Sequence, residues 1–210
     1  MKLKEPRGLT ALKPDVLINA YCQGFFPMAD LVTARVAWYS PDPRAIIPLD
    51  SFHVSRSLRR TVRKRPFEIR INSAFESVIK RCSEREETWI SSEIIKAYTL
   101  LHTEGFAHSV ECWNEEGLRG GLYGVAIGGA FFGESMFSLS PDASKVALVH
   151  LVQRLKSRKF LLLDTQFINA LVARFGAREI SRSLYLRLLQ RAVVVKTRFE
   201  DGECGNDRDL

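Results

Sequence analysis

Cysteine and histidine are scarce in this chain, with four of each among 210 residues. The cysteines, Cys22, Cys82, Cys112 and Cys204, are too widely separated for a zinc knuckle and too few for a disulfide scaffold. The sequence has no clustered His or Cys ligands and no Gly-rich phosphate loop ending in Lys and Ser or Thr. We therefore expect reduced, structural thiols, no metal and no cofactor.

Long apolar runs are also absent. No stretch approaches the roughly 20 residues that cross a bilayer, and the first six residues lack the apolar core of a signal peptide. The sequence thus predicts a cytoplasmic protein. Hydrophobic residues still make up 46% of the chain, with 3 Trp and 13 Phe, which excludes a disordered protein and predicts one sizeable core.

Acidic residues are missing from one strongly basic segment. The chain carries 31 Lys and Arg against 24 Asp and Glu, a formal net charge of +7, which permits a nucleic-acid partner without establishing one. Residues 55–66 contain six of these cations and no acid. In a helix, five of them align along one broad face: Arg56, Arg59, Arg60, Arg63 and Lys64. A phosphate backbone is the natural complement, and a basic surface helix without special purpose is the alternative.

The first 44 residues predict a helix followed by irregular structure. A helix-start signal at Lys13 precedes an apolar stripe that runs to Tyr21, and Gly24 ends it. Two prolines in residues 38–44 forbid helix and predict a linker before a strand at residues 45–48. We place a soft domain boundary near residues 36–44.

The rest of the chain predicts an α+β sandwich with a splayed sheet. Strands are expected at residues 67–72, 107–113, 117–127, 129–137 and 160–163, followed at the end by a further strand and helix. Helices are expected at residues 74–82, 91–105, 143–158 and 168–175, and Ser92 is the expected cap of the second. The tail from residue 200 is polar and expected to fray.

Two apolar runs end in carboxylates. One leads into Glu134 and the other into Asp164, which places an acid at the end of each of two predicted strands, where α/β proteins form pockets. Gln166 follows Asp164 by two residues, so in an extended segment both side chains point the same way. A helix-capping role for Asp164 and a buried salt bridge for Glu134 remain open as structural alternatives.

Eight motifs in this order resemble those of the leucyl/phenylalanyl-tRNA protein transferases, from about Glu5 to Ala192. They are GFFPMAD at 24–30, WYSPDPRA at 38–45, SFHVSRSLRR at 51–60, ETWIS at 87–91, HSVECW at 108–113, GGLYGVAIGGAFFGESMFS at 120–138, ASKVAL at 143–148 and LLDTQ at 162–166.

The resemblance implies an activity and an architecture. The family moves Leu or Phe from aminoacyl-tRNA to the N-terminal Arg or Lys of a protein, marking it for degradation in the N-end rule pathway, and Met is a further candidate donor. The resemblance implies a GNAT-like (N-acetyltransferase-like) catalytic domain at residues 41–195, after a small N-terminal domain at 1–40 and before a polar tail at 196–210. A monomer is the default expectation.

The same resemblance assigns roles to the site residues. It implies that Asp164 holds the incoming amine, that Gln166 orients it and that Glu134 lies in the aminoacyl site. An aminoacyl ester reacts downhill to an amide, and an α-amine with a pKa of about 7.7 to 8.0 is partly neutral near physiological pH. We therefore expect alignment and hydrogen bonding, rather than a strong general base, to supply most of the acceleration.

The substrate-binding positions of the family fall on apolar and basic residues. The aminoacyl pocket maps to Met28, Trp89, Phe131, Ser135 and Met136, although the apolar members are equally typical of a core. Met28 departs from the pattern, because better-known members carry Trp there, and a flexible thioether replaces a flat aromatic wall. The tRNA-acceptor patch falls on the five aligned cations of residues 55–66.

Two other functions compete. An acyl-CoA-dependent GNAT acyltransferase needs a glycine-rich turn to cradle pyrophosphate, and residues 140–145 lack those glycines. A non-catalytic tRNA-binding module would use the basic helix, but it has no need for Glu134, Asp164 and Gln166 around an apolar pocket.

Overall fold

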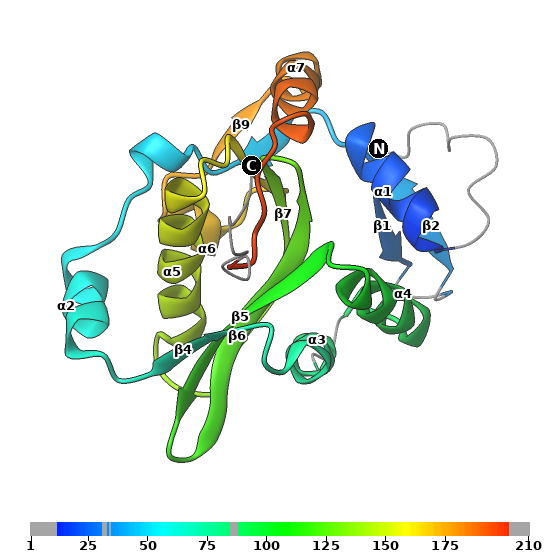
Figure 1. The fold of residues 1–210 in the computed structure, drawn as a ribbon. Coiled ribbons are helices and arrows are strands. Elements are labelled where there is room, and N and C mark those ends of the chain that lie inside the picture. Colours follow the sequence, from blue (N-terminus) through cyan, green and yellow to red (C-terminus); the bar gives the residue numbers. More distant parts are fainter. Residues whose placement is uncertain (1–11, 31–32, 34, 85–87, 202–210) are drawn as a thin grey trace, which may run out of the picture.

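A seven-stranded mixed sheet forms the centre of the protein (Figure 1). The computed structural model describes residues 12–30, 33, 35–84 and 88–201. The strands lie in the order β4-β5-β6-β7-β8-β3-β9, and every neighbouring pair is antiparallel except β7 and β8. Their bounds are β3 Arg44–Ile46, β4 Glu68–Ile71, β5 Ala107–Asn114, β6 Gly117–Ile127, β7 Ala130–Ser138, β8 Leu162–Gln166 and β9 Arg178–Ile180. This arrangement confirms the α+β class.

Helices cover both faces of the sheet. Helix α5 (Ala143–Ser157) lies on one face, and α3 (Phe75–Ser83) and α4 (Ser92–Thr103) lie on the other (Figure 1). Successive side chains of β7 point to opposite faces of the sheet. Phe131 therefore packs in the core beside α5, and the next residue, Phe132, packs in the core beside α3 and α4. The sheet is therefore buried on both faces.

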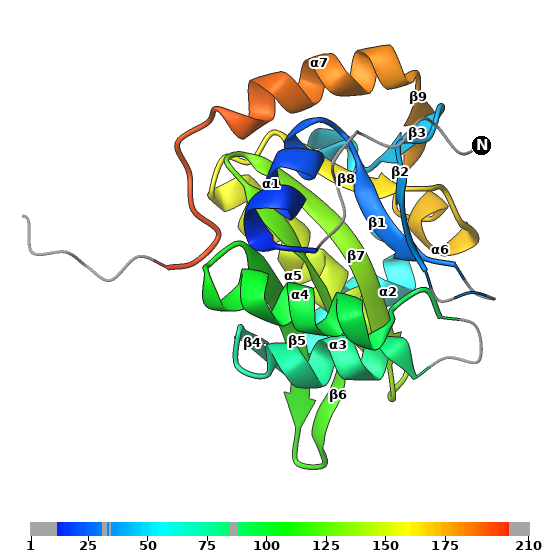
Figure 2. The same ribbon diagram turned by 90° about the vertical axis from the view of Figure 1, so that its right-hand side faces the viewer.

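The segment before the sheet contains structure that the sequence did not predict. Helix α1 (Pro14–Cys22) is followed by a two-stranded ribbon of β1 (Phe26–Ala29) and β2 (Val36–Tyr39). The prediction of irregular structure here was therefore wrong, because a ribbon this short gives a weak alternating pattern. Figure 2 shows α1 and the ribbon against the sheet, and side chains of both elements belong to the core that also contains α4.

Most other elements match the prediction, with changes at their ends. The expected strand at 160–163 begins only at Leu162 and continues to Gln166 as β8. The expected helix at 168–175 is reduced to α6 (Ala170–Ala173), which Asn169 caps by accepting hydrogen bonds from two backbone N–H groups. Ser91, rather than Ser92, caps α4 by accepting a bond from the backbone N–H of Ile94.

The described part of the chain ends in helix α7 (Arg182–Val193) and a segment that packs back on the sheet. Phe199 is buried and stacks on His108, while Arg154 donates to the Phe199 carbonyl and pairs with Asp201 at 2.9 Å. Of the tail that was expected to fray, only Glu200 and Asp201 are among the described residues, and the expectation stays a prediction. Cys204 lies outside the described residues.

The predicted basic helix is confirmed as α2 (Arg56–Lys64), which follows a short 3-10 turn at Leu49–Ser51. Ser55 caps it, and Leu58 is its buried anchor, so the helix packs on α5 through a narrow contact. Figure 1 shows α2 on the outer side of α5. Within the described ranges, no helix is long and apolar enough to cross a membrane.

Candidate functional site

A cavity of about 380 Å³ opens between the ends of β7 and β8. Its wall is mainly apolar and includes a few polar groups. The aromatic and aliphatic part includes Phe26, Met28, Trp89, Met136 and Leu171, and the polar part includes Glu134, Ser135, Thr165, Gln166 and Asn169. A mainly apolar cavity with a few convergent polar groups is typical of a small-molecule site.

The cavity exists because two parallel strands part. β7 and β8 pair over only three residue pairs, from Ala130 with Leu162 to Phe132 with Asp164. Beyond them, β7 continues beside β6 while β8 turns toward β3, and the next residues of both strands line the cavity. The sequence predicted that Glu134 and Asp164 reach one pocket from two strands, and this is wrong for Asp164: the cavity is lined by Glu134 and by Gln166, two residues after Asp164.

Glu134 sits on a β-bulge. Tyr123 faces Ser135 and Gly124 faces Gly133 across the β6–β7 ladder, so Glu134 is the extra residue between them. A bulge of this kind redirects one side chain out of the regular alternation. Gly124 permits the close packing behind it, because a Cβ there would lie 2.3 Å from the carbonyl oxygen of Phe132.

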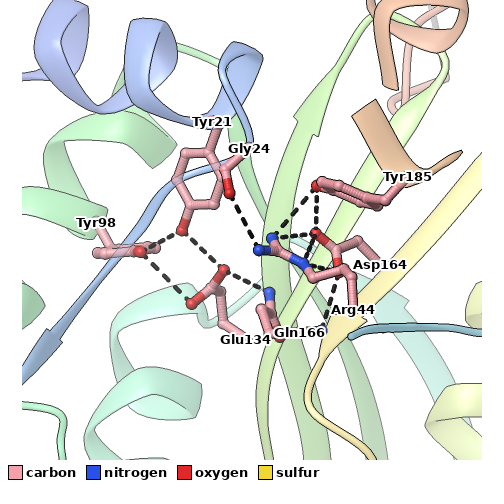
Figure 3. A network of polar contacts seen from close by, with 8 residues as sticks. All are labelled: Tyr21, Gly24, Arg44, Tyr98, Glu134, Asp164, Gln166 and Tyr185. Atoms are coloured by element: carbon pink, nitrogen blue, oxygen red, sulfur yellow. Dashed lines mark hydrogen bonds and ion pairs between the residues drawn. The ribbon is translucent and has the colours of Figure 1, made fainter. Parts of the chain in front are cut away.

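Three donors surround the Glu134 carboxyl group (Figure 3). Tyr21 donates to Oε1 at 2.7 Å, Gln166 donates to the same oxygen at 3.3 Å, and Tyr98 donates to Oε2 at 3.4 Å. The two tyrosine hydroxyls also contact each other. Burial raises the pKa of Glu134 to about 8, against the opposing hydrogen bond from Tyr21, and the charge of Asp164 raises it further. The carboxyl group is therefore largely protonated at neutral pH.

Asp164 lies in a sealed ion pair instead. Its carboxylate and the guanidinium of Arg44 are fully buried and 2.6 Å apart, and Tyr185 donates to the same carboxylate at 2.7 Å (Figure 3). Arg44 also donates to the carbonyl of Gly24 at the end of α1. Burial lowers the pKa of Arg44, but the charge and hydrogen bond of Asp164, together with Tyr185 and Glu134, outweigh burial and raise the pKa overall. Asp164 does not line the cavity.

Gln166 connects the two carboxyl groups. Its backbone N–H donates to Oδ1 of Asp164 at 2.9 Å, and its side-chain amide donates to Glu134. Its φ of 57° lies in the left-handed region, which is uncommon for a residue with a side chain. The bond to Asp164 stabilises this turn of the backbone and so helps to aim the Gln166 amide at the cavity.

The other predicted pocket residues divide into two groups. Met28, Trp89, Ser135 and Met136 line the cavity, as expected of pocket residues. Phe131 does not, because its ring is fully buried among the residues that pack on α5. It supports the wall from behind.

The five cations of α2 lie apart from the cavity. All of them are exposed, and none lines it. They are Arg56, Arg59, Arg60, Arg63 and Lys64. The structure therefore presents two separate features, an apolar cavity with polar groups and a basic helix.

Sequence reasoning missed four residues of the site. Arg44 was missed because two prolines just before it predicted a linker. Tyr21, Tyr98 and Tyr185 were missed because each lies in the apolar pattern of a helix. The available signal was a polar group, a tyrosine hydroxyl or the Arg44 guanidinium, within or next to an apolar segment. Such a group requires a hydrogen-bonding partner when it is buried. Within the described part of the chain, no group of His, Cys, Asp and Glu side chains is placed to hold a metal ion.

Comparison with known proteins decides the family. The model for the leucyl/phenylalanyl-tRNA protein transferases matches residues 46–190, and the model for their N-terminal domain matches residues 10–42. The chain belongs to the leucyl/phenylalanyl-tRNA protein transferase family. This confirms the resemblance seen in the motifs.

Individual members of the family match along most of their length. The leucyl/phenylalanyl-tRNA protein transferase of Akkermansia muciniphila is 53% identical, covering 87% of this chain and 96% of that protein. The one from Herpetosiphon aurantiacus is 54% identical, covering 90% and 98%. A solved structure, that of L-PGS from Bacillus licheniformis, aligns at 12% identity with a TM-score of 0.46, covering 80% of this chain and 66% of that one.

Proposed function

We infer that this protein is an aminoacyltransferase that moves Leu or Phe, with Met as a further donor, from aminoacyl-tRNA to the N-terminal Arg or Lys of proteins. The product is a protein marked for degradation in the N-end rule pathway. Family membership supports the activity. The observation that links this activity to the cavity is that Glu134 and Gln166 lie together in its otherwise mainly apolar wall.

The cavity receives the donor side chain. Its volume of about 380 Å³ falls within the usual range for small-molecule sites. Met28, Trp89 and Met136 offer an apolar surface to a Leu or Phe side chain, and Ser135 adds a hydroxyl to the wall. An apolar pocket disfavours small side chains by leaving space unfilled, which matches large apolar donors.

Glu134 meets the α-amino group of the donor. In the empty site its pKa is raised to about 8, chiefly by burial. A cationic ammonium group next to the carboxyl favours its ionised form, so donor binding and deprotonation of Glu134 are coupled. This coupling selects a free α-amino group on the donor.

The reaction is aminolysis of an ester. The nitrogen of the acceptor α-amine attacks the ester carbonyl carbon, the bond from that carbon to the ribose oxygen breaks, and the proton lost by nitrogen ends on the released hydroxyl. Because the amine has a pKa of about 7.7 to 8.0, it is partly neutral at the start. Gln166 orients the reactants through its amide, which has no basic function near neutral pH.

Asp164 acts through Gln166. Its two oxygens already accept bonds from Arg44, Tyr185 and the backbone N–H of Gln166. We therefore propose a positioning role for Asp164 in place of the direct contact with the amine that the family resemblance implies.

The remaining parts of the proposal concern architecture and partners. The basic face of α2 binds the tRNA acceptor stem through phosphates, which gives affinity with little base readout. The separate family models for residues 10–42 and 46–190 support a small N-terminal domain before a GNAT-like catalytic domain, with division near residue 40. The protein works as a monomer in the cytoplasm, where aminoacyl-tRNA is available.

The direct test is transfer of label. The protein is incubated with labelled Phe-tRNA or Leu-tRNA and peptides that begin with Arg or Lys, and an N-acetylated Arg peptide of the same sequence is the control. We expect label on the free basic peptides alone. Absence of transfer to every basic peptide contradicts the proposed function. Neither the acyl-CoA enzyme nor the non-catalytic module gains support from the comparisons.

A further inference from the structure

A second depression lies between the basic helix and the candidate site. Its volume is about 380 Å³, and it has contributions from the loop before α2, the start of α5 and α6. His53, Asp142, Lys145, Leu171 and Arg174 are among its lining residues. The functional assignment above uses none of them except Leu171.

Leu171 connects this depression to the substrate cavity. It lines both, and with Met136 it also lines a third depression beside them. Leu171 itself is only partly buried. The substrate cavity and the depression at the beginning of α2 therefore adjoin at Leu171, and we call the surface from the mouth of the cavity, over Leu171, to that depression the groove.

The end of the groove next to α2 has a net positive charge. Lys145 pairs with Asp142 at 2.7 Å, so these two charges offset each other. Arg174 is exposed and, among the described residues, has no ion-pair partner, which leaves its charge available. His53 is exposed and lines the same depression. Beyond the groove, the exposed cations of α2 extend this positively charged surface.

The geometry of the substrate requires such a connection, if the proposed function holds. The aminoacyl group in the cavity is attached to the terminal ribose of the tRNA, and its phosphate chain must leave through the mouth of the cavity. The acceptor stem, when bound by α2, lies at the other end of the groove. The unpaired 3′ strand therefore has to cross the surface between them.

We propose that this groove binds the single-stranded 3′ end of aminoacyl-tRNA. Arg174 contacts a phosphate of the strand, Lys145 contributes a second donor next to Asp142, and the apolar side chain of Leu171 packs against a base or ribose near the cavity. A basic groove with an apolar contact is a common way to hold a single strand without reading its sequence. The proposal rests on the proposed function and extends its donor site by these residues.

The test compares a long donor with a short one. Arg174→Glu is assayed with Phe-tRNA and with 3′-O-phenylalanyl-adenosine, which carries the aminoacyl group but is too short to cover the groove. We expect the KM for Phe-tRNA to rise about tenfold or more, and the slope of log affinity against log salt to fall by about 1. The kcat and KM for the short donor should stay within about twofold of those of the unchanged protein.

Two further variants act as controls. Arg191→Glu makes the same change of charge at an exposed position of α7, which lies away from α2 in both ribbon views. It should leave the KM for Phe-tRNA and its salt dependence unchanged. Arg174→Gln removes the charge without reversing it and should raise the KM in the same direction by a smaller factor.

The outcomes separate the groove from the activity. An equal loss with both donors means that Arg174 acts on the cavity, and an unchanged KM for Phe-tRNA means that no phosphate contacts it; either result overturns the proposal. If the unchanged protein transfers from neither donor, the proposed function fails first. Filter binding of Phe-tRNA then still tests the groove, because Arg174→Glu must weaken binding and Arg191→Glu must not.

Discussion

Glu134 and Asp164 belong to neighbouring strands, yet their surroundings differ in almost every respect. Glu134 lies on a bulge at the wall of a cavity and is surrounded by neutral donors, whereas Asp164 is sealed from solvent against the guanidinium of Arg44. Burial without a cationic partner raises the pKa of Glu134 to about 8, while burial beside a cation makes Asp164 half of an ion pair. The two carboxyl groups therefore suit different tasks.

The difference teaches that the end of a strand does not by itself define a catalytic group. Gln166 touches both carboxyl groups, through its backbone on one side and its amide on the other. The charged group fixes the backbone of Gln166, and the neutral group lines the cavity. Each of the following changes tests one side of this division.

The largest expected effect comes from breaking the buried pair. Arg44→Met leaves Asp164 charged and unpaired inside the protein, which should lower the free energy of unfolding by about 3 to 5 kcal/mol. Urea unfolding at pH 7.5 measures this. Adding Asp164→Leu to the same chain removes the stranded charge and should recover most of the loss. If Arg44→Met alone is as stable as the unchanged protein, the ion pair is not buried away from water.

The neutral state of Glu134 predicts a specific pH dependence. A carboxyl group with a raised folded pKa contributes stability that is fully present below its unfolded pKa, about 4.3, and is lost as pH rises through about 8. The loss is about 5 kcal/mol at most. Glu134→Gln has no such titration. The difference in unfolding free energy between the two proteins should therefore shift in favour of Glu134→Gln from pH 5 to pH 9, and a constant difference would contradict the raised pKa.

Gln166 should affect the reaction more than binding. Gln166→Asn tolerates the left-handed backbone but draws the amide back from Glu134. We expect kcat to fall about 100-fold, in the range seen when one oriented donor is lost, while the KM for Phe-tRNA changes less than about twofold. Steady-state kinetics with a fixed basic peptide measures both. A rise in KM with an unchanged kcat would make Gln166 a binding residue only.

The smallest expected effect concerns the hydroxyl group behind Asp164. Tyr185→Phe removes one hydrogen bond to the carboxylate but retains the ion pair with Arg44. We expect a loss of stability of about 1 kcal/mol, measured by urea unfolding, and a decrease in kcat smaller than that of Gln166→Asn. If Tyr185→Phe lowers kcat as much as Gln166→Asn does, the hydroxyl itself takes part in the reaction.

Sequence patterns predicted the parts of the fold that are long and regular. The β5–β7 meander and α5 were recognised because their runs exceed one structural period and end in turn residues. The ribbon of β1 and β2 was missed, since four-residue strands interrupted by a proline give almost no periodic signal. The expected helix at 168–175 was too long, because Asn169 caps α6 and the apolar side chains of Phe167 and Ile168 before it remain exposed.

Only part of the cavity lining was predicted from the sequence, and the residues that support it were missed. Glu134 and Gln166 reach one cavity, as two strand ends suggested, but the separation of Asp164 from that cavity depends on Arg44, which lies 120 positions away in sequence. The bulge that redirects Glu134 arises from a one-residue mismatch between β6 and β7. The sequence of one strand shows neither which residues it pairs with across the sheet nor the register of that pairing.

The anchoring of Phe199 has a practical consequence for work with this protein. Its ring covers His108 and contacts Phe131 and Phe160, so a chain shortened before this residue uncovers apolar surface over the core beside α5. The Arg154–Asp201 pair holds the same segment two residues later. Affinity tags and fluorescent fusions at this end therefore belong after Asp201, and truncated expression variants should retain every residue up to it.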